Sequence, residues 1–312
     1  MNKEARILVT GAKGFVGKSL CCKLREKDYK NVFSFESSVY NLKVEQEVKK
    51  LFEENERFEV VIHLAAIVKG IKFRKEKPAS IFYDNLMMNT LIQEYALRNK
   101  VSKFIGLGSV VVYSEDSKMP FEEVDYLKGE PEETNYSYSI AKRAMLQQGK
   151  AYRKQYGFNS VHLIMANMYG PGFEVDSDEL YVIPSLIKRF AEAKEKNLQQ
   201  VVVWGSGKAC REFLYIDDAS EAIILAMEKY NEPEPLNIGT GVETPIKELA
   251  EKISKLIKYK GEIIWDTTKP EGKLRNVSNV IKAMKLIGFK ARTNLEEGLR
   301  KTIEYYEGKK IF

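Results

Sequence analysis

The stretch ILVTGAKGFVG, residues 7–17, decides the fold of this chain. Its first four residues are apolar or β-branched, as in a buried strand, and the glycines that follow have the spacing GxxGxxG. At a junction between a strand and a helix, Gly11 permits a tight turn, Gly14 lets the backbone approach a pyrophosphate, and Gly17 lets the helix lie close to the strand. The stretch therefore predicts the first βα unit of a dinucleotide-binding sheet.

Strands and helices alternate along the first half of the chain. Apolar, β-branched runs that are typical of strands lie at residues 6–10, 31–35, 59–63, 103–108 and 160–165. Helical patterns separate them at residues 44–54, at residues 79–98 and from about residue 135. This alternation predicts an α/β fold with a Rossmann-type doubly wound parallel sheet, which binds ligands outside the carboxyl ends of its strands.

The second half of the chain is less regular. From Asn167 onward the apolar segments are shorter and are interrupted by glycine turns, so we expect a smaller C-terminal α/β lobe that binds the substrate. The predicted dinucleotide-binding domain covers residues 1–170 and about 213–240, and the predicted lobe covers residues 171–212 and 241–312.

The end of the second predicted strand bears on the choice of cofactor. Glu36 lies about twenty residues beyond the glycine loop, where a carboxylate accepts both ribose hydroxyls and repels a 2′-phosphate. Lys13 favours NADP(H) instead, because a basic side chain inside the loop can hold that 2′-phosphate. We give Glu36 more weight, so NAD(H) is favoured and NADP(H) stays open. The candidate cofactor contacts are Gly11, Lys13, Gly14, Phe15, Val16, Gly17, Glu36, Asn41, Leu42, Leu64, Ala65, Ala66, Tyr138 and Lys142.

A tyrosine and a lysine in the segment YSIAK form the candidate catalytic pair. Tyr138 and Lys142 are four residues apart and therefore share one face of a helix. The pKa of a tyrosine phenol is about 10 in model peptides, and we expect the ammonium of Lys142 to lower the pKa of Tyr138. Ser109 follows the fourth predicted strand, where the reactive ring of a cofactor would lie. Together the three predict hydride transfer at an alcohol or ketone carbon, with Tyr138 moving the proton and Lys142 reaching the nicotinamide ribose.

The overall composition argues against several other classes of protein. The net charge of +6 comes with lysines interleaved among glutamates, so we expect no nucleic-acid groove. No apolar run approaches the roughly 18 residues of a membrane span, and the chain opens without a signal peptide. Cys21 and Cys22 are adjacent and cannot easily pair, and the two histidines, His63 and His162, are not clustered. We therefore expect a cytoplasmic protein with no disulfide framework, no membrane partner and no metal site.

The chain resembles the extended short-chain dehydrogenase/reductases (the NAD-dependent epimerase/dehydratases), and within them the GDP-L-fucose synthases. The general marks are the glycine loop, the three candidate catalytic residues, and residues 167–170 and 215–218. The more specific marks are residues 201–207, 211–213, 237–241 and 269–272.

The resemblance implies that Ser109, Tyr138 and Lys142 are the catalytic triad of hydride transfer at C4 of a GDP-sugar, in a family that serves capsule and polysaccharide biosynthesis. It also implies a homodimer or a higher homo-oligomer, with the dimer packed through the helices at residues 79–98 and 136–156. In the family a second basic residue follows the position of Arg275, but Asn276 stands there in this chain. The implied GDP-sugar contacts are Asn167, Val182, Arg189, Val203, Trp204, Arg211 and Arg275.

Two departures from the family pattern narrow the predicted function. GDP-L-fucose synthases also invert C3 and C5, with a cysteine two residues after the catalytic serine and a histidine just before a Val-Ile-Pro segment. This chain has Val111 and Tyr181 at those positions, and a valine cannot move a proton. We therefore predict a nucleotide-sugar C4 oxidoreductase acting on a GDP-linked (6-deoxy)hexose or heptose, by 4-keto reduction or C4-OH oxidation, without C3/C5 epimerisation.

Three alternatives stay open. A bifunctional GDP-L-fucose synthase would need an unusual acid/base pair for C3 and C5. A 4,6-dehydratase would need an acidic residue close after Ser109, where residues 110–112 are valines. A non-catalytic NAD(P)-binding protein would be expected to lose the tyrosine or the lysine of the pair, and both are present.

Overall fold

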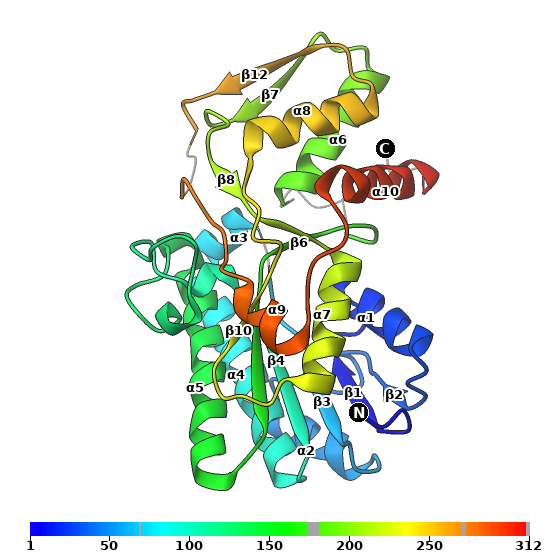
Figure 1. The fold of residues 1–312 in the computed structure, drawn as a ribbon, viewed down its shortest axis with the longest axis vertical. Coiled ribbons are helices and arrows are strands. Elements are labelled where there is room, and N and C mark those ends of the chain that lie inside the picture. The colour runs from blue at the N-terminus through cyan, green and yellow to red at the C-terminus, as the bar shows by residue number, and fades with distance from the viewer. Residues whose placement is uncertain (69, 174–180, 270–272, 310–312) are drawn as a thin grey trace.

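A six-stranded parallel sheet forms the centre of the computed structural model, which describes residues 1–68, 70–173, 181–269 and 273–309 (Figure 1). The strand order is β10-β5-β4-β3-β1-β2, so the order reverses between β1 and β3, and ligands bind at such a switch point in open α/β sheets. All neighbouring strands are parallel, which confirms the predicted fold class. The strands are β1 (Ile7–Thr10), β2 (Val32–Phe33), β3 (Val60–His63), β4 (Lys103–Ser109), β5 (Ser160–Met165) and β10 (Leu236–Ile238).

Helices cover both faces of this sheet. Side chains alternate along a strand, so Ile7 and Val9 of β1 pack with the helices of one face, while Leu8 packs with those of the other. The first face carries α1 (Phe15–Glu26), α7 (Ile216–Lys229) and α9 (Ile281–Ile287). The second face carries α2 (Glu45–Glu53), α4 (Pro78–Arg98) and α5 (Tyr136–Tyr156).

A smaller α/β lobe lies at one end of the sheet, at the top of Figure 1, around a second hydrophobic core. Its helices are α6 (Val182–Glu195), α8 (Ile246–Ile257) and α10 (Leu295–Gly308). Parallel strands β7 (Gln200–Trp204) and β12 (Glu262–Asp266) pack against these helices. Two further strand pairs complete it: antiparallel β8 (Cys210–Arg211) with β11 (Thr244–Pro245), and parallel β6 (Asn167–Tyr169) with β9 (Phe213–Tyr215).

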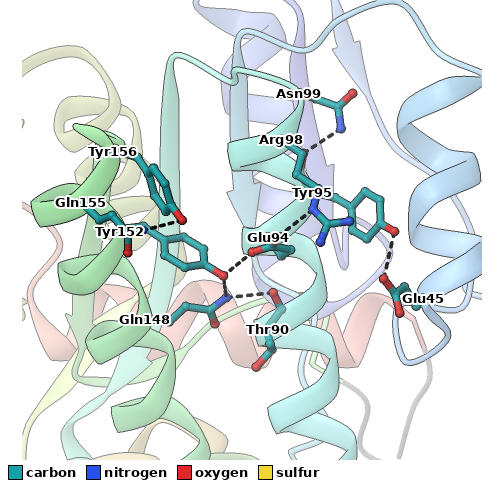
Figure 2. Close-up of polar contacts among 10 residues, drawn as sticks. All are labelled: Glu45, Thr90, Glu94, Tyr95, Arg98, Asn99, Gln148, Tyr152, Gln155 and Tyr156. Carbon is teal, nitrogen blue, oxygen red and sulfur yellow. Dashed lines mark hydrogen bonds and ion pairs between the residues drawn. The ribbon is translucent and has the colours of Figure 1, made fainter.

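Helices α4 and α5 lie side by side, and hydrogen bonds join them (Figure 2). The Tyr152 hydroxyl donates to the Glu94 carboxylate, and Gln148 Nε2 donates to the carbonyl oxygen of Thr90 at 3.1 Å. Their long apolar faces are buried against the sheet, which explains why both were predicted from the sequence. Across the described ranges, none of the helices combines the length and apolar character needed to cross a membrane.

The predicted division into domain and lobe stays a prediction. Within the range assigned to the lobe, α9 packs against α7 and β10, beside the sheet. The sequence analysis did not predict α9 or α10, nor a short helix, α3 (Ile71–Glu76), after β3.

Candidate active site

The glycine loop joins β1 to α1 as the motif predicts. Gly11 has a φ of +69°, and a Cβ placed there would lie 2.8 Å from the backbone nitrogen of Ala65 in the neighbouring loop. Gly14 is the N-cap of α1, and its N–H donates to the Gly11 carbonyl oxygen at 3.0 Å. A Cβ on Gly17 would lie 2.5 Å from Ala12 Cα, so only glycine lets α1 approach the loop this closely. The backbone N–H groups at this helix start are suited to a phosphate.

Lys13 and Glu36, which argue for different cofactors, form an ion pair with each other. Both side chains are exposed, at 70% and 57%, so this pair is accessible at the end of β2. Phe15 opens α1, and its ring centroid lies 5.2 Å from that of Phe173 at the base of the lobe. Val16 contacts both the sheet core and the lobe core.

The remaining predicted cofactor residues follow β2 and β3. Asn41 is held by Glu47, whose Oε2 accepts its backbone N–H at 2.6 Å, and Leu42 is buried. The backbone N–H groups of Leu64 and Ala65 both donate to Thr10 Oγ1 at 3.2 Å, which places the loop of residues 64–66 beside the glycine loop. Ala66 lies in the same loop and is half-buried.

The residues after Ser109 are held against α5 by hydrogen bonds. Ser109 is the last residue of β4, and a single turn of 3₁₀ helix, η1 (Val110–Val112), follows. Ser139 Oγ donates to the Val111 carbonyl oxygen at 2.8 Å, and Arg143 donates to the Val112 carbonyl oxygen from Nε at 2.9 Å and Nη2 at 2.6 Å. The residues just after Ser109 are therefore bonded to those just after Tyr138 and Lys142.

Tyr138 and Lys142 lie on the inner side of α5. Lys142 Nζ lies 5.8 Å from the ring centroid of Tyr138, and the lysine is only 1% exposed. The Tyr126 hydroxyl donates to the Lys142 carbonyl oxygen at 2.9 Å. Burial lowers the pKa of Lys142 to about 8. Within the described part of the chain, no three histidine, cysteine, aspartate or glutamate side chains are grouped to hold a metal ion.

The expectation that Lys142 lowers the pKa of Tyr138 is wrong for this structure. The pKa of Tyr138 is raised, first by burial of the phenol and then by the nearby Tyr181. The cost of desolvating a phenolate exceeds the attraction of nearby positive charge. The cation that opposes the rise is Arg74, which the sequence analysis missed.

Arg74 enters the site from α3. Its Nη1 donates to Asn135 Oδ1, and Asn135 is the N-cap of the helix that carries Tyr138. The basic segment around Arg74 lacks helical apolar periodicity, so no local pattern predicts a helix there. Tertiary contact with α4 and the turn before α5 holds it in place.

The two departures from the family pattern, Val111 and Tyr181, lie on different elements. Val111 is half-buried in η1, and its carbonyl oxygen accepts the Ser139 bond described above. Tyr181 is the N-cap of α6, and its ring packs edge-on against Phe173 with centroids 5.2 Å apart. Its contribution to the raised pKa of Tyr138 shows that it lies near that residue.

Trp204, one of the residues predicted to contact the GDP-sugar, is 57% exposed. The Arg189 guanidinium lies 5.8 Å from its ring and Lys269 Nζ lies 5.9 Å away, so two cations flank one indole. The neighbouring Val203 faces the lobe core and is buried, so it can offer a ligand only its backbone. Val182 is the first residue of α6 and is half-buried.

The other predicted substrate residues are held by hydrogen bonds within the protein. Arg211 Nη1 donates to the carbonyl oxygens of Cys210 and Lys273, at 2.8 and 2.6 Å. Arg275 forms a two-pronged ion pair with the Glu243 carboxylate at 2.7 to 3.1 Å. Asn167 Nδ2 donates to the Glu212 carbonyl oxygen at 3.0 Å. Of the predicted turn at residues 269–272, residues 270–272 lie outside the described residues.

Comparisons with known proteins agree with this arrangement. The family model described as "NAD dependent epimerase/dehydratase family" matches residues 7–239. A GDP-L-fucose synthase from Sinorhizobium fredii is 37% identical over 301 residues, which cover 96% of this chain and 95% of that protein.

Solved structures extend the similarity to the whole fold. A GDP-6-OMe-4-keto-L-xylo-heptose reductase from C. jejuni superposes with a TM-score of 0.93 at 26% identity, covering 99% of each chain. A GDP-mannoheptose C4 reductase from Campylobacter jejuni with NADP bound superposes with a TM-score of 0.90 at 28% identity, covering 98% of this chain and 99% of that one. The chain belongs to the NAD dependent epimerase/dehydratase family, the extended short-chain dehydrogenase/reductases.

Proposed function

We propose that this protein is a GDP-sugar C4 oxidoreductase that transfers a hydride to or from C4 without inverting C3 or C5. The observation that supports the proposal is the attachment of η1, which follows Ser109, to α5, which carries Tyr138 and Lys142. The GDP-sugar class is supported by the relatives, whose names include a GDP-L-fucose synthase and two GDP-heptose reductases. The flanked indole of Trp204 offers a stacking surface for a base.

The mechanism follows from the protonation states of the pair. A bound nicotinamide cofactor supplies the hydride for reduction and accepts it in oxidation. Tyr138, kept as a neutral phenol by burial, gives its proton to the alkoxide that forms at C4. Ser109 donates a hydrogen bond to the same oxygen, and Lys142 would hold the nicotinamide ribose. These donors act on charge that appears only in the transition state.

The lack of epimerisation is the part of the proposal that separates it from the nearest alternative. The 37% identity to a GDP-L-fucose synthase keeps the bifunctional activity as a second candidate. Val111 has no group that can carry a proton, and Tyr181 is a phenol packed on Phe173. A GDP-4-keto sugar incubated with enzyme in heavy water should therefore gain no deuterium at C3 or C5. Enzyme-dependent incorporation at either carbon would favour the bifunctional candidate.

Removal of one hydroxyl tests the assigned proton donor. Tyr138→Phe should lower turnover of a GDP-4-keto sugar by at least about 100-fold while cofactor affinity stays within about threefold, because only proton transfer is lost. Tyr136→Phe removes the same hydroxyl from an exposed position two residues earlier and is the matched control. Full turnover by the Tyr138 variant would contradict the proposed mechanism.

We further infer that NAD(H) is preferred, on the basis of Glu36. The solved relative binds NADP, so the preference is a property to be tested in this chain. Glu36→Gln removes the negative charge and leaves Lys13 without its partner, so the ratio of kcat/KM for NADP(H) over NAD(H) should rise at least about tenfold. Adding Lys13→Met to that variant should cancel the gain. An unchanged ratio in the single variant would show that Glu36 does not select the cofactor.

We also propose a homodimer formed through α4 and α5. Tyr83 on α4 and Tyr156 on α5 are 58% and 57% exposed, which is unusual for large aromatic side chains on packed helices. A bundle of these helices with those of a second copy would cover both. Light scattering should give a mass of about twice the 35.8 kDa chain, and a monomer at micromolar concentration would exclude the dimer.

A further inference from the structure

A chain of buried hydrogen bonds crosses the protein from the glycine loop to the catalytic helix. Thr10 Oγ1 lies 2.8 Å from His63 Nδ1, and His63 Nε2 lies 3.0 Å from Asn89 Oδ1. Asn89 Nδ2 then donates to the Ala141 carbonyl oxygen at 3.2 Å. Thr10, His63 and Asn89 are each at most 1% exposed, so water cannot replace these bonds.

The direction of every bond in this chain is determined by the groups at its ends. Thr10 Oγ1 already accepts the N–H groups of Leu64 and Ala65, so its own hydrogen must point to His63 Nδ1. His63 Nδ1 is then an acceptor, and the ring hydrogen sits on Nε2 and is donated to Asn89. The Asn89 amide oxygen accepts this hydrogen, and its nitrogen donates to the carbonyl oxygen of Ala141. Only a neutral His63 with hydrogen on Nε2 lets all four groups of the chain, those of Thr10, His63, Asn89 and Ala141, form these bonds.

The two ends of the chain are parts of the candidate site. Thr10 directly precedes Gly11 and holds the loop that packs against it. Ala141 directly precedes Lys142 and lies one turn from Tyr138 on α5. We propose that His63 and Asn89 are positioning residues that set the catalytic helix relative to the cofactor loop. This inference rests on the proposed function only for its turnover readout.

The structure contains a matched control one helical turn away. Gln93 is also on α4, is fully buried, and donates from Nε2 to the Met145 carbonyl oxygen of α5 at 3.1 Å. Its other partner is Ser160, which bonds to His162 at 2.8 Å. This second link joins the same two helices with the same kind of bond, but it reaches neither the glycine loop nor the residue beside Lys142. Loss of stability should therefore be similar for the two links, and loss of function should not.

The test compares Asn89→Leu with Gln93→Met, which replace each amide by an apolar side chain of similar shape. We expect similar decreases in Tm for the two variants. Asn89→Leu should also lower kcat at least tenfold with the GDP-sugar KM within threefold, and weaken NADH affinity, measured by fluorescence, at least fivefold. Gln93→Met should keep both within threefold of wild type. His63→Gln, which can still donate to Asn89, should retain more turnover than His63→Leu.

The outcomes separate this inference from the proposed function. If wild type turns over no GDP-4-keto sugar, the proposed function fails, and the NADH arm alone decides the inference. Equal NADH affinity and equal kcat in the Asn89 and Gln93 variants would overturn the positioning role, because both links would then be purely structural. The same holds if His63→Gln and His63→Leu behave alike.

Discussion

At the scale of single residues, burial acts on the two ionisable members of the catalytic pair in opposite directions. It raises the pKa of the Tyr138 phenol and lowers the pKa of the Lys142 ammonium to about 8. At neutral pH both are therefore protonated, a phenol beside an ammonium. That state suits donation of a proton to an alkoxide, whereas oxidation needs the phenolate and should become faster as pH rises.

The pKa of Lys142 predicts where reduction declines. Lys142 is charged below about pH 8 and loses its proton above it, so kcat/KM for reduction should fall above about pH 8 while Tyr138 stays protonated. A pH–rate profile from 6 to 10 measures this. Burial also lowers the pKa of Lys103 to about 8, but Lys103 lies at the opposite end of β4. Lys103→Met should therefore leave the decline of kcat/KM above about pH 8 unchanged. A flat profile to about pH 9.5 would contradict the assignment.

At the scale of elements, the strands and helices of the first half were largely predictable, whereas α3, α9 and α10 were not. The predicted strand at 160–165 agrees with β5, and the predicted helix at 79–98 agrees with α4 to within one residue. The second strand is only Val32–Phe33, because it lies at the sheet edge with a partner on one side. Helix α3 forms through its contacts with α4 and the turn before α5, which no local pattern records.

Two glycines of the loop between β1 and α1 have different predicted roles: Gly17 in packing and Gly14 in cofactor binding. Gly17→Ala places a Cβ against the Ala12 backbone, so it should lower the free energy of unfolding by about 1–3 kcal/mol. On Gly14 a Cβ would meet only the Gly11 carbonyl oxygen, at 3.2 Å, and φ there is −73°. Gly14→Ala should therefore stay within about 1 kcal/mol of wild type yet weaken cofactor binding at least tenfold. Urea denaturation and cofactor titration measure the two effects, and an unchanged cofactor affinity in the Gly14 variant would argue against a phosphate at this loop.

At the scale of the whole molecule, the candidate site is assembled from segments that are distant in sequence, which limits what the sequence could predict. Ser109, Tyr138 and Lys142 could be named because each follows a strand or shares a helix face. Arg74 and the bonds from Ser139 and Arg143 could not be named, because they depend on how helices pack after the sheet forms. The sign of the Tyr138 pKa shift was missed for the same reason.

The same packing predicts acid sensitivity of the fold. Burial lowers the pKa of both His63 and His162 to about 3, whereas an unfolded histidine titrates near about 6.5. A histidine whose folded pKa is lowered binds more protons in the unfolded state below about 6.5, so stability is complete at neutral pH and is lost as pH falls. At pH 5 each histidine should remove about 2 kcal/mol from the free energy of unfolding.

Urea denaturation at pH 7 and pH 5 measures this loss directly. His162→Gln should reduce the difference between the two pH values by about half, because one titrating group remains. A difference that stays the same in this variant would assign the acid sensitivity to other groups.

The position of the two tryptophans has a spectroscopic consequence. Trp204 and Trp265 are the only ones in the sequence, and they lie on the paired strands β7 and β12 of the lobe. Emission excited selectively from tryptophan therefore reports on the lobe alone, because the sheet domain contains tyrosines but no tryptophan. A guanine stacked on the exposed indole of Trp204 would quench that emission, whereas NADH bound at the sheet would instead accept energy from it. A single fluorescence titration can therefore distinguish a ligand bound at the lobe from a cofactor bound at the sheet, without any turnover.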